Sequence, residues 1–166
     1  MAEKGGSAAA GPGPAWEVRL AGLEDVTSVA SAVRRLLDEL EGTPSPASAL
    51  ESAARLLIAT PSAGAVLVAE SEGALVGVLA TSWQLAIHVP GSYALIQDVW
   101  VHPAWRGRAV GGSLVARLVE MAEERNLTRI EVGLPRESFR HFGATEGFYL
   151  ANDFAPLGPR MRRRLS

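Results

Sequence analysis

The chain has 166 residues, of which 48% are hydrophobic and 20% are charged, and its formal net charge is −2. This length and composition predict one soluble globular domain whose core needs neither a metal nor a disulfide. The absence of cysteine excludes thiol catalysis, iron–sulfur clusters and cysteine-ligated zinc. The slightly acidic balance argues against a nucleic-acid partner, because non-specific binding to phosphates requires a positive field.

The beginning of the chain predicts no structure and no targeting signal. Residues 1–15 are rich in glycine, alanine and proline and offer nothing to bury, so we expect a disordered tail followed by a domain over residues 16–166. A signal-peptide pattern is absent, and no apolar run is long enough to span a bilayer. We therefore expect a cytoplasmic protein without membrane contact.

The first half of the domain predicts a strand over residues 17–20, two helices, and an antiparallel meander. Apolar residues recur at helical spacing from Val26 to Leu40, and Asp38, Glu39 and Glu41 are expected to point outward. Ser48 and Glu51 have the spacing of a capping box, which predicts the start of the second helix. The meander is expected over residues 65–69, 75–88 and 93–101, with turns at 71–73 and 89–91.

The second half predicts two more helices and further strands. An apolar stripe favours a helix over residues 111–125, with Asn126 suited to a left-handed cap. A strand over 128–132, a helix over 145–151 and a closing strand over 161–165 complete the order β-α-α-β-β-β-α-β-α-β-β. Met161 and Leu165 flank the arginines of the closing segment, which favours a strand over a nucleic-acid patch. The fold class is α+β, with a mixed, mostly antiparallel sheet flanked by helices.

The segment from Asp98 to Ser113 is the most informative part of the chain for function. It predicts a strand, then a short loop rich in glycine and arginine, then a helix that begins with Gly111, Gly112 and Ser113. The start of such a helix offers unpaired amides and about half a positive charge, which together suit a phosphate. Neither usual nucleotide-binding fingerprint is present, so the segment predicts either an anion site or a tight connection.

Two patterns resemble the GNAT acyltransferase superfamily. Arg106-Gly107-Arg108-Ala109-Val110-Gly111 follows Val101-His102-Pro103 and resembles motif A, Arg/Gln-x-x-Gly-x-Gly/Ala, with Ala109 in place of the first glycine. A methyl group is tolerable there if the local φ is negative. Phe148-Tyr149-Leu150-Ala151-Asn152-Asp153-Phe154 resembles the family's Phe-Tyr-x-x-x-Gly-Phe, with Asp153 replacing glycine. The resemblance covers residues 16–165 in element order.

The resemblance implies that acetyl-CoA binds at this loop as the acyl donor, and it implies no metal. The pyrophosphate would lie on the amides of residues 107–112, where a branched side chain at Gly111 would intrude. The pantetheine arm would pair with the backbone of Val99 and Val101, and an N–H near Val99 would stabilise the thioester oxygen. The implied cofactor-binding residues are Val99, Trp100, Val101, Arg106, Gly107, Arg108, Ala109, Val110, Gly111, Gly112 and Ser113.

The same resemblance implies an N-acetyltransferase that joins the acetyl group to a primary amine of a small molecule or peptide by direct attack in a ternary complex. Tyr149 would protonate the departing thiolate, although its ring also suits core packing. Leu95 stands where some relatives carry a catalytic glutamate, which leaves Asp98 and His102 as candidate bases. A non-catalytic acyl-CoA-binding module and an arginine-based nucleic-acid-binding domain remain alternatives, and a homodimer stays open.

Overall fold

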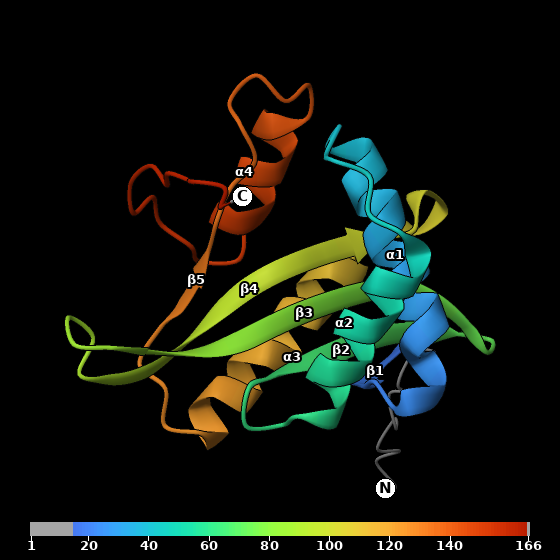
Figure 1. Ribbon diagram of the computed structural model, residues 1–166, viewed down its shortest axis with the longest axis horizontal. Helices are drawn as coiled ribbons and strands as arrows, with labels where there is room; N and C mark the ends of the chain where they lie inside the picture. The colour runs from blue at the N-terminus through green and yellow to red at the C-terminus, as the bar shows by residue number, and fades with distance from the viewer. Residues whose placement is uncertain (1–14, 166) are drawn as a thin grey trace, which may run out of the picture.

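A five-stranded sheet organises residues 15–165, the part of the chain that this computed structural model describes. Its order is β1-β2-β3-β4-β5, antiparallel except for the parallel pair β4 and β5 (Figure 1). The expected tail over residues 1–15 lies almost entirely outside this part. The strands are β1 (Glu17–Leu20), β2 (Gly64–Ser71), β3 (Ala74–Ala86), β4 (Gly91–Val101) and β5 (Ile130–Val132).

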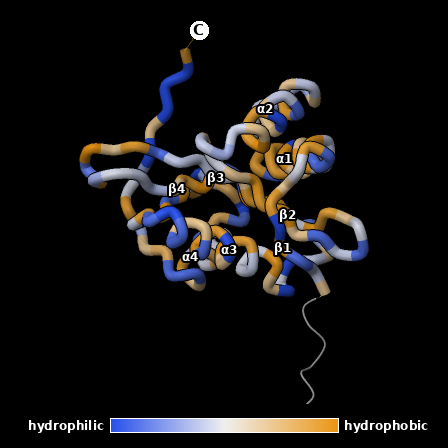
Figure 2. Tube along the Cα trace, turned by 90° about the horizontal axis from the view of Figure 1, so that it is seen from below, coloured by the Kyte–Doolittle hydropathy of each residue, from blue (hydrophilic) through white to orange (hydrophobic). Residues whose placement is uncertain are grey.

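Four helices cover the two faces of the sheet. Figure 2 shows α1 and α2 on one side, and α3 and α4 on the other. The predicted α+β class and the order of elements through α4 are therefore confirmed. No helix within residues 15–165 is long and apolar enough to cross a bilayer. The helices are α1 (Val26–Glu39), α2 (Ala47–Ala59), α3 (Val110–Glu124) and α4 (Phe142–Leu150), with short 3-10 turns η1 (Leu23–Asp25) and η2 (Pro103–Trp105).

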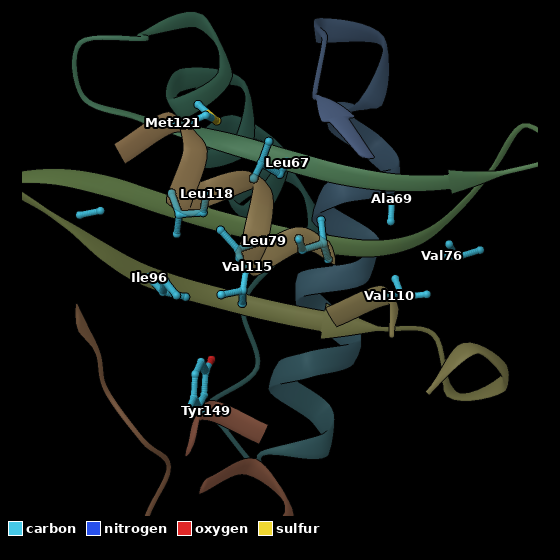
Figure 3. Packing of buried hydrophobic residues seen from close by; sticks show 13 residues of the cluster. Leu67, Ala69, Val76, Leu79, Ile96, Val110, Val115, Leu118, Met121 and Tyr149 are labelled. Atoms are coloured by element: carbon cyan, nitrogen blue, oxygen red, sulfur yellow. The ribbon is translucent and has the colours of Figure 1, made fainter. Parts of the chain in front are cut away.

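Each face of the sheet buries its own apolar cluster. The cluster beneath α3 and α4 is the larger, and the close-up of Figure 3 shows strand and helix side chains meeting there. Leu67 and Leu79 of the sheet and Leu114 and Leu118 of α3 are all fully buried. The opposite cluster joins alternate strand residues such as Val68 and Val78 to α1. This alternation follows from the two-residue period of strands. The apolar clusters hold β4 and α3 in place, and the candidate site is built from the ends of these two elements.

A bulge interrupts β4 near its centre. Ala80 of β3 pairs with Asp98, but the next residue, Thr81, pairs with Ile96, so Gln97 is an extra residue in β4. The hydroxyl of Thr81 is fully buried and donates to the Leu95 carbonyl at 3.1 Å. A bulge bends a strand and re-aims its side chains, so β4 changes direction immediately before Asp98.

Strands β4 and β5 then separate. They pair over only three residues each, Ala94–Ile96 with Ile130–Val132, whereas β4 continues to Val101. Figure 1 shows β5 leaving the sheet beside the middle of β4. The outer edge of β4 beyond the bulge consequently has no strand beside it within the described residues.

The start of α2 differs from the predicted capping box. The helix begins at Ala47 after Pro46, and no side chain caps it. The Pro46 carbonyl instead accepts from the amides of Ala49 and Leu50 at 3.0 and 3.2 Å. Ser48 therefore lies inside the helix. Pro46, with its fixed φ, already provides the extended residue that precedes the first turn.

The expected strands after α4 are absent, so the prediction for residues 161–165 was wrong. Residues 154–165 form neither helix nor strand. Met161 is fully exposed and Leu165 is 87% exposed, so neither finds an apolar face. Pro156 and Pro159 also lack the N–H groups that a ladder requires.

Candidate active site

The loop between β4 and α3 ends in a row of unpaired backbone amides. Ala109 is the N-cap of α3, and its carbonyl accepts the first helical bond from the Ser113 amide at 3.0 Å. Within residues 15–165 the amides of 107–112 donate to no acceptor. Because these donors lie at the positive end of a 15-residue helix, they favour a bound anion.

Ala109 adopts a left-handed conformation, with φ of 67° and ψ of 9°. The condition under which its methyl group was expected to be harmless, a negative φ, is therefore not met. The left-handed region costs a residue with a Cβ roughly 1–2 kcal/mol. The chain thus carries local strain where the family pattern has glycine.

The glycines of the loop differ in what surrounds them. A Cβ at Gly107 would meet nothing within 4 Å, although its φ of 72° favours glycine, and one at Gly112 would lie 3.6 Å from Asn152. A Cβ at Gly111 would fall 2.9 Å from the Phe148 ring and 3.7 Å from Val101. A side chain at Gly111 would therefore also press on α4, because Gly111 packs against Phe148.

Arg106 braces the loop from within the protein. Its Nε donates to the Val101 carbonyl at 2.9 Å, and its Nη2 donates to both carboxylate oxygens of Glu39, at 2.7 and 2.9 Å. The indole of Trp100 donates to the same carboxylate at 3.1 Å. Glu39 was expected to point outward; it instead joins α1 to the β4–α3 loop. No sequence signal reveals this contact, because 67 residues separate the partners.

Arg108 remains available on the outer side of the loop. Its guanidinium lies 5.3 Å from the centre of the Trp105 ring, and the Trp105 ring meets Trp16 edge to face. The Trp16 indole donates to Ser113 Oγ at 3.3 Å, and Ser113 Oγ donates to the Ala109 carbonyl at 3.0 Å. Trp16, which sequence reasoning did not single out, therefore supports the first turn of α3.

The outer edge of β4 offers free backbone groups beside this loop. His102 N–H donates to the Val76 carbonyl of β3 at 2.9 Å. Because amides along a strand alternate in direction, those of Val99 and Val101 face away from β3, toward the side that β5 has left. Both side chains pack on the α3 face, whereas Trp100 is buried in the α1 face, so its indole lies away from this edge.

Tyr149 approaches this edge from α4. The residue is 8% exposed, its ring packs edge to face on Phe148 and Phe154, and Figure 3 shows the hydroxyl directed toward β4. The hydroxyl makes no hydrogen bond within the described residues. Every fully buried side-chain polar atom among them has a hydrogen-bond partner, so the Tyr149 hydroxyl is not fully buried. Burial, with a smaller effect of the Asp98 charge, raises the pKa of Tyr149 to about 12.

Asp98 stands directly after the bulge and is half-buried. Burial raises the pKa of its carboxyl above the usual range, so the group holds a proton more readily than an exposed aspartate. The charge of Asp98 contributes to the raised pKa of Tyr149. Asp98 follows the last β4 residue that pairs with β5, and Tyr149 packs on the cluster of the α3 face.

His102 and Leu95 do not supply a better base. The Nδ1 atom of His102 accepts from the Ala104 amide at 3.2 Å and caps η2, so that nitrogen is occupied. Leu95 is buried, with 8% exposure. No group of histidines and carboxylates within residues 15–165 is arranged to hold a metal ion.

The comparisons with known proteins agree with this geometry. Residues 32–148 match the acetyltransferase (GNAT) family, and the chain belongs to that family. An uncharacterized N-acetyltransferase of Archaeoglobus fulgidus is 32% identical over 90 residues. This alignment covers 53% of the chain and 58% of the relative, so the chain spans less than two thirds of the length of that relative.

Solved structures share the fold at low sequence identity. A possible acetyltransferase from Clostridium difficile 630 has a TM-score of 0.78 at 16% identity, covering 91% of this chain and 97% of that one. An aminoglycoside N-acetyltransferase in complex with CoA has a TM-score of 0.75 at 12% identity, with coverages of 94% and 98%. These similarities show that the whole arrangement of sheet and helices is a fold shared with these structures.

Proposed function

We propose that this protein is an acetyl-CoA-dependent N-acetyltransferase that moves an acetyl group to a primary amine of a small molecule or peptide. One observation carries the proposal: the unpaired amides of residues 107–112 lie beside the unpaired edge of β4 at Val99 and Val101. Together they offer an anion site next to a strip of backbone donors and acceptors. A pyrophosphate joined to an extended amide-containing arm needs these two features.

The residues present fit acetyl-CoA, which supplies an activated acetyl group. The amides of 107–112 bind the pyrophosphate, and Arg108 adds a positive charge at the rim, since its guanidinium has no carboxylate partner among the described residues. Val99 and the N–H of Val101 pair with the amide groups of the arm, since the Val101 carbonyl already accepts from Arg106. Arg106 acts indirectly, because Glu39 and the Val101 carbonyl already occupy its guanidinium. Its role is to hold the loop against β4 and α1.

The chemistry uses groups at the point where β4 and β5 separate. The Val99 N–H donates to the carbonyl oxygen on which negative charge develops, and it needs no reorientation to do so. Tyr149 donates its phenolic proton to the departing sulfur. With a pKa of about 12, the phenol remains protonated at neutral pH. Asp98 accepts the proton of the attacking amine, directly or through a water.

The acceptor approaches from the face opposite α3. The donor lies against the start of α3, so the amine reaches the acetyl group from the side of α1 and α2, where Asp98 pairs with Ala80 of that face. Both substrates are bound together, and the acetyl group passes directly between them. The chain has no cysteine that could carry the acetyl group as a thioester.

The test is thiol release from acetyl-CoA in the presence of a panel of primary amines, with the acetylated amine identified by mass spectrometry. Because the protein lacks cysteine, a thiol reagent detects only the CoA that is set free. We expect amine-dependent release. Release that no amine accelerates, combined with a clear rise in melting temperature on adding CoA, would replace the enzyme with a non-catalytic acyl-CoA-binding module.

A further inference from the structure

The end of the described chain is a basic segment without regular structure. Residues 160–165, here called the arginine tail, contain Arg160, Arg162, Arg163 and Arg164, all exposed. Figure 2 shows the tail as largely hydrophilic and places its end on the side of the sheet that α1 and α2 cover. This is the face from which the acceptor approaches.

Two contacts fix where the tail lies. The Arg160 side chain packs against Gly133, directly after β5, where a Cβ would fall 2.8 Å from its Nη1. Arg164 Nη2 donates to Thr43 Oγ1, in the α1–α2 connection, at 2.9 Å. The tail therefore spans from the end of β5 to the end of α1. Arg162 and Arg163 lie between these two contacts, in the stretch that borders the acceptor side.

The charges of the tail are not neutralised by the protein itself. The ion pairs within residues 15–165 include none of its four arginines. Glu39, the carboxylate at the end of α1, is already held by Arg106 and Trp100. The chain is acidic as a whole, but the part after β5 is basic. It contains Arg136, Arg140, Arg160, Arg162, Arg163 and Arg164 against Glu137, Glu146 and Asp153.

We propose that the acceptor of this enzyme carries a carboxylate or phosphate close to its amino group, and that Arg162 and Arg163 attract this negative charge. The inference rests on the proposed function, because the acceptor side is defined by where the donor binds. Guanidinium groups pair with both kinds of anion. The same positive charge repels polyamines and other polycationic acceptors.

The test compares kcat/KM for acceptors that differ in charge. Three peptides with the same N-terminal residue, Ala-Glu-Glu-Ala, Ala-Gln-Gln-Ala and Ala-Arg-Arg-Ala, all C-terminally amidated, probe carboxylates. Phosphoethanolamine against ethanolamine probes phosphate. We expect kcat/KM to be about tenfold higher for an anionic acceptor than for its neutral counterpart, since each exposed charge pair contributes about a factor of five or less. The preference shrinks as salt rises.

Variants assign the preference to the tail. The double variant Arg162→Ser and Arg163→Ser is expected to abolish the preference for anionic acceptors while leaving kcat/KM for Ala-Gln-Gln-Ala unchanged. Arg117→Glu is the control, because it changes the net charge by the same amount on α3, where Arg117 pairs with Glu120. The control is expected to keep the wild-type preference.

Several results would overturn the inference. Equal kcat/KM for anionic, neutral and cationic peptides in the wild type would do so while leaving the acetyltransferase intact. An equal loss on charged and neutral acceptors in the double variant would make the tail a structural element. Salt-sensitive binding of a single-stranded oligonucleotide without any acceptor preference would assign the tail to nucleic acid. Failure of all five acceptors, with no release on any other amine, would reject the proposed function as well.

Discussion

Tyr149 packs in the core, and the chemical role that we propose for its hydroxyl can be tested separately from this packing. Its ring contacts Phe148 and Phe154, while its hydroxyl has no partner within the described residues. Burial raises the pKa of the phenol to about 12, so the folded protein holds this proton more tightly than the unfolded chain, whose tyrosine pKa is about 10. The resulting stability is fully present below pH 10 and is lost as the pH rises through 12.

Tyr149→Phe removes only the proton donor. We predict a fall in kcat of at least about tenfold, with CoA affinity nearly unchanged and a change in the free energy of unfolding below about 1 kcal/mol. Steady-state thiol release measures the rate, and Tyr93→Phe, at the other tyrosine of the chain, is the control that keeps full activity. Equal turnover of both variants and the wild type would leave Tyr149 with packing alone.

Asp98 and Tyr149 are coupled through charge. The negative charge of Asp98 contributes to the raised pKa of Tyr149, so Asp98→Asn is predicted to lower that pKa while burial still keeps it above 10. The measurement is the ultraviolet absorbance of the phenolate in a Tyr93→Phe background, with circular dichroism verifying that the protein stays folded. A titration midpoint that does not move would mean that the two groups lie too far apart to act together.

Ala109 is strained where the family pattern has glycine. Ala109→Gly relieves about 1–2 kcal/mol of left-handed strain and costs about 0.4–1 kcal/mol through the freer unfolded chain. The predicted net gain in the free energy of unfolding is therefore between about 0 and 1.6 kcal/mol, measured by denaturant titration. Ala104→Gly, in the 3-10 turn of the same loop, is the control and should destabilise. A loss of stability in Ala109→Gly would contradict the left-handed conformation.

At the scale of elements, the contact between α1 and the β4–α3 loop depends on one carboxylate. Glu39 is 33% exposed and Arg106 46% exposed, so their pair is partly screened and contributes about 0.5–1 kcal/mol. We predict that Glu39→Gln lowers the free energy of unfolding by this amount at low salt and by less at high salt. Glu41→Gln, which removes the same charge two residues later, should have an effect below about 0.5 kcal/mol. Indistinguishable effects would show that the contact does not stabilise the fold.

Elements defined by a local pattern were predictable, and those defined by distant partners were not. The stripe of α3, the turn at Asn126 and the meander follow from short-range periodicity, and the family motif marked the loop and Tyr149. The bulge at Gln97 and the early end of β5 depend on how distant strands meet. The arginine tail was wrongly predicted as a strand because Met161 and Leu165 alternate with charged residues in the sequence. The sequence could not show that no apolar face lies beside them, which leaves both side chains exposed.

At the scale of the whole molecule, the sheet places two kinds of unpaired backbone side by side. The α3 amides belong to a helix terminus, and the β4 edge belongs to a strand that continues beyond the last residue paired with β5. Such amides exchange rapidly with solvent because nothing in the protein holds them. Their exchange therefore reports directly on what binds there.

Hydrogen–deuterium exchange of the full chain with and without CoA tests the location of the donor most directly. We predict that CoA slows exchange at residues 107–112 and at Val99 and Val101, with little change in α2, which lies on the opposite face. The α2 peptide serves as the internal control. Protection confined to other segments, or none at saturating CoA, would contradict the proposed site.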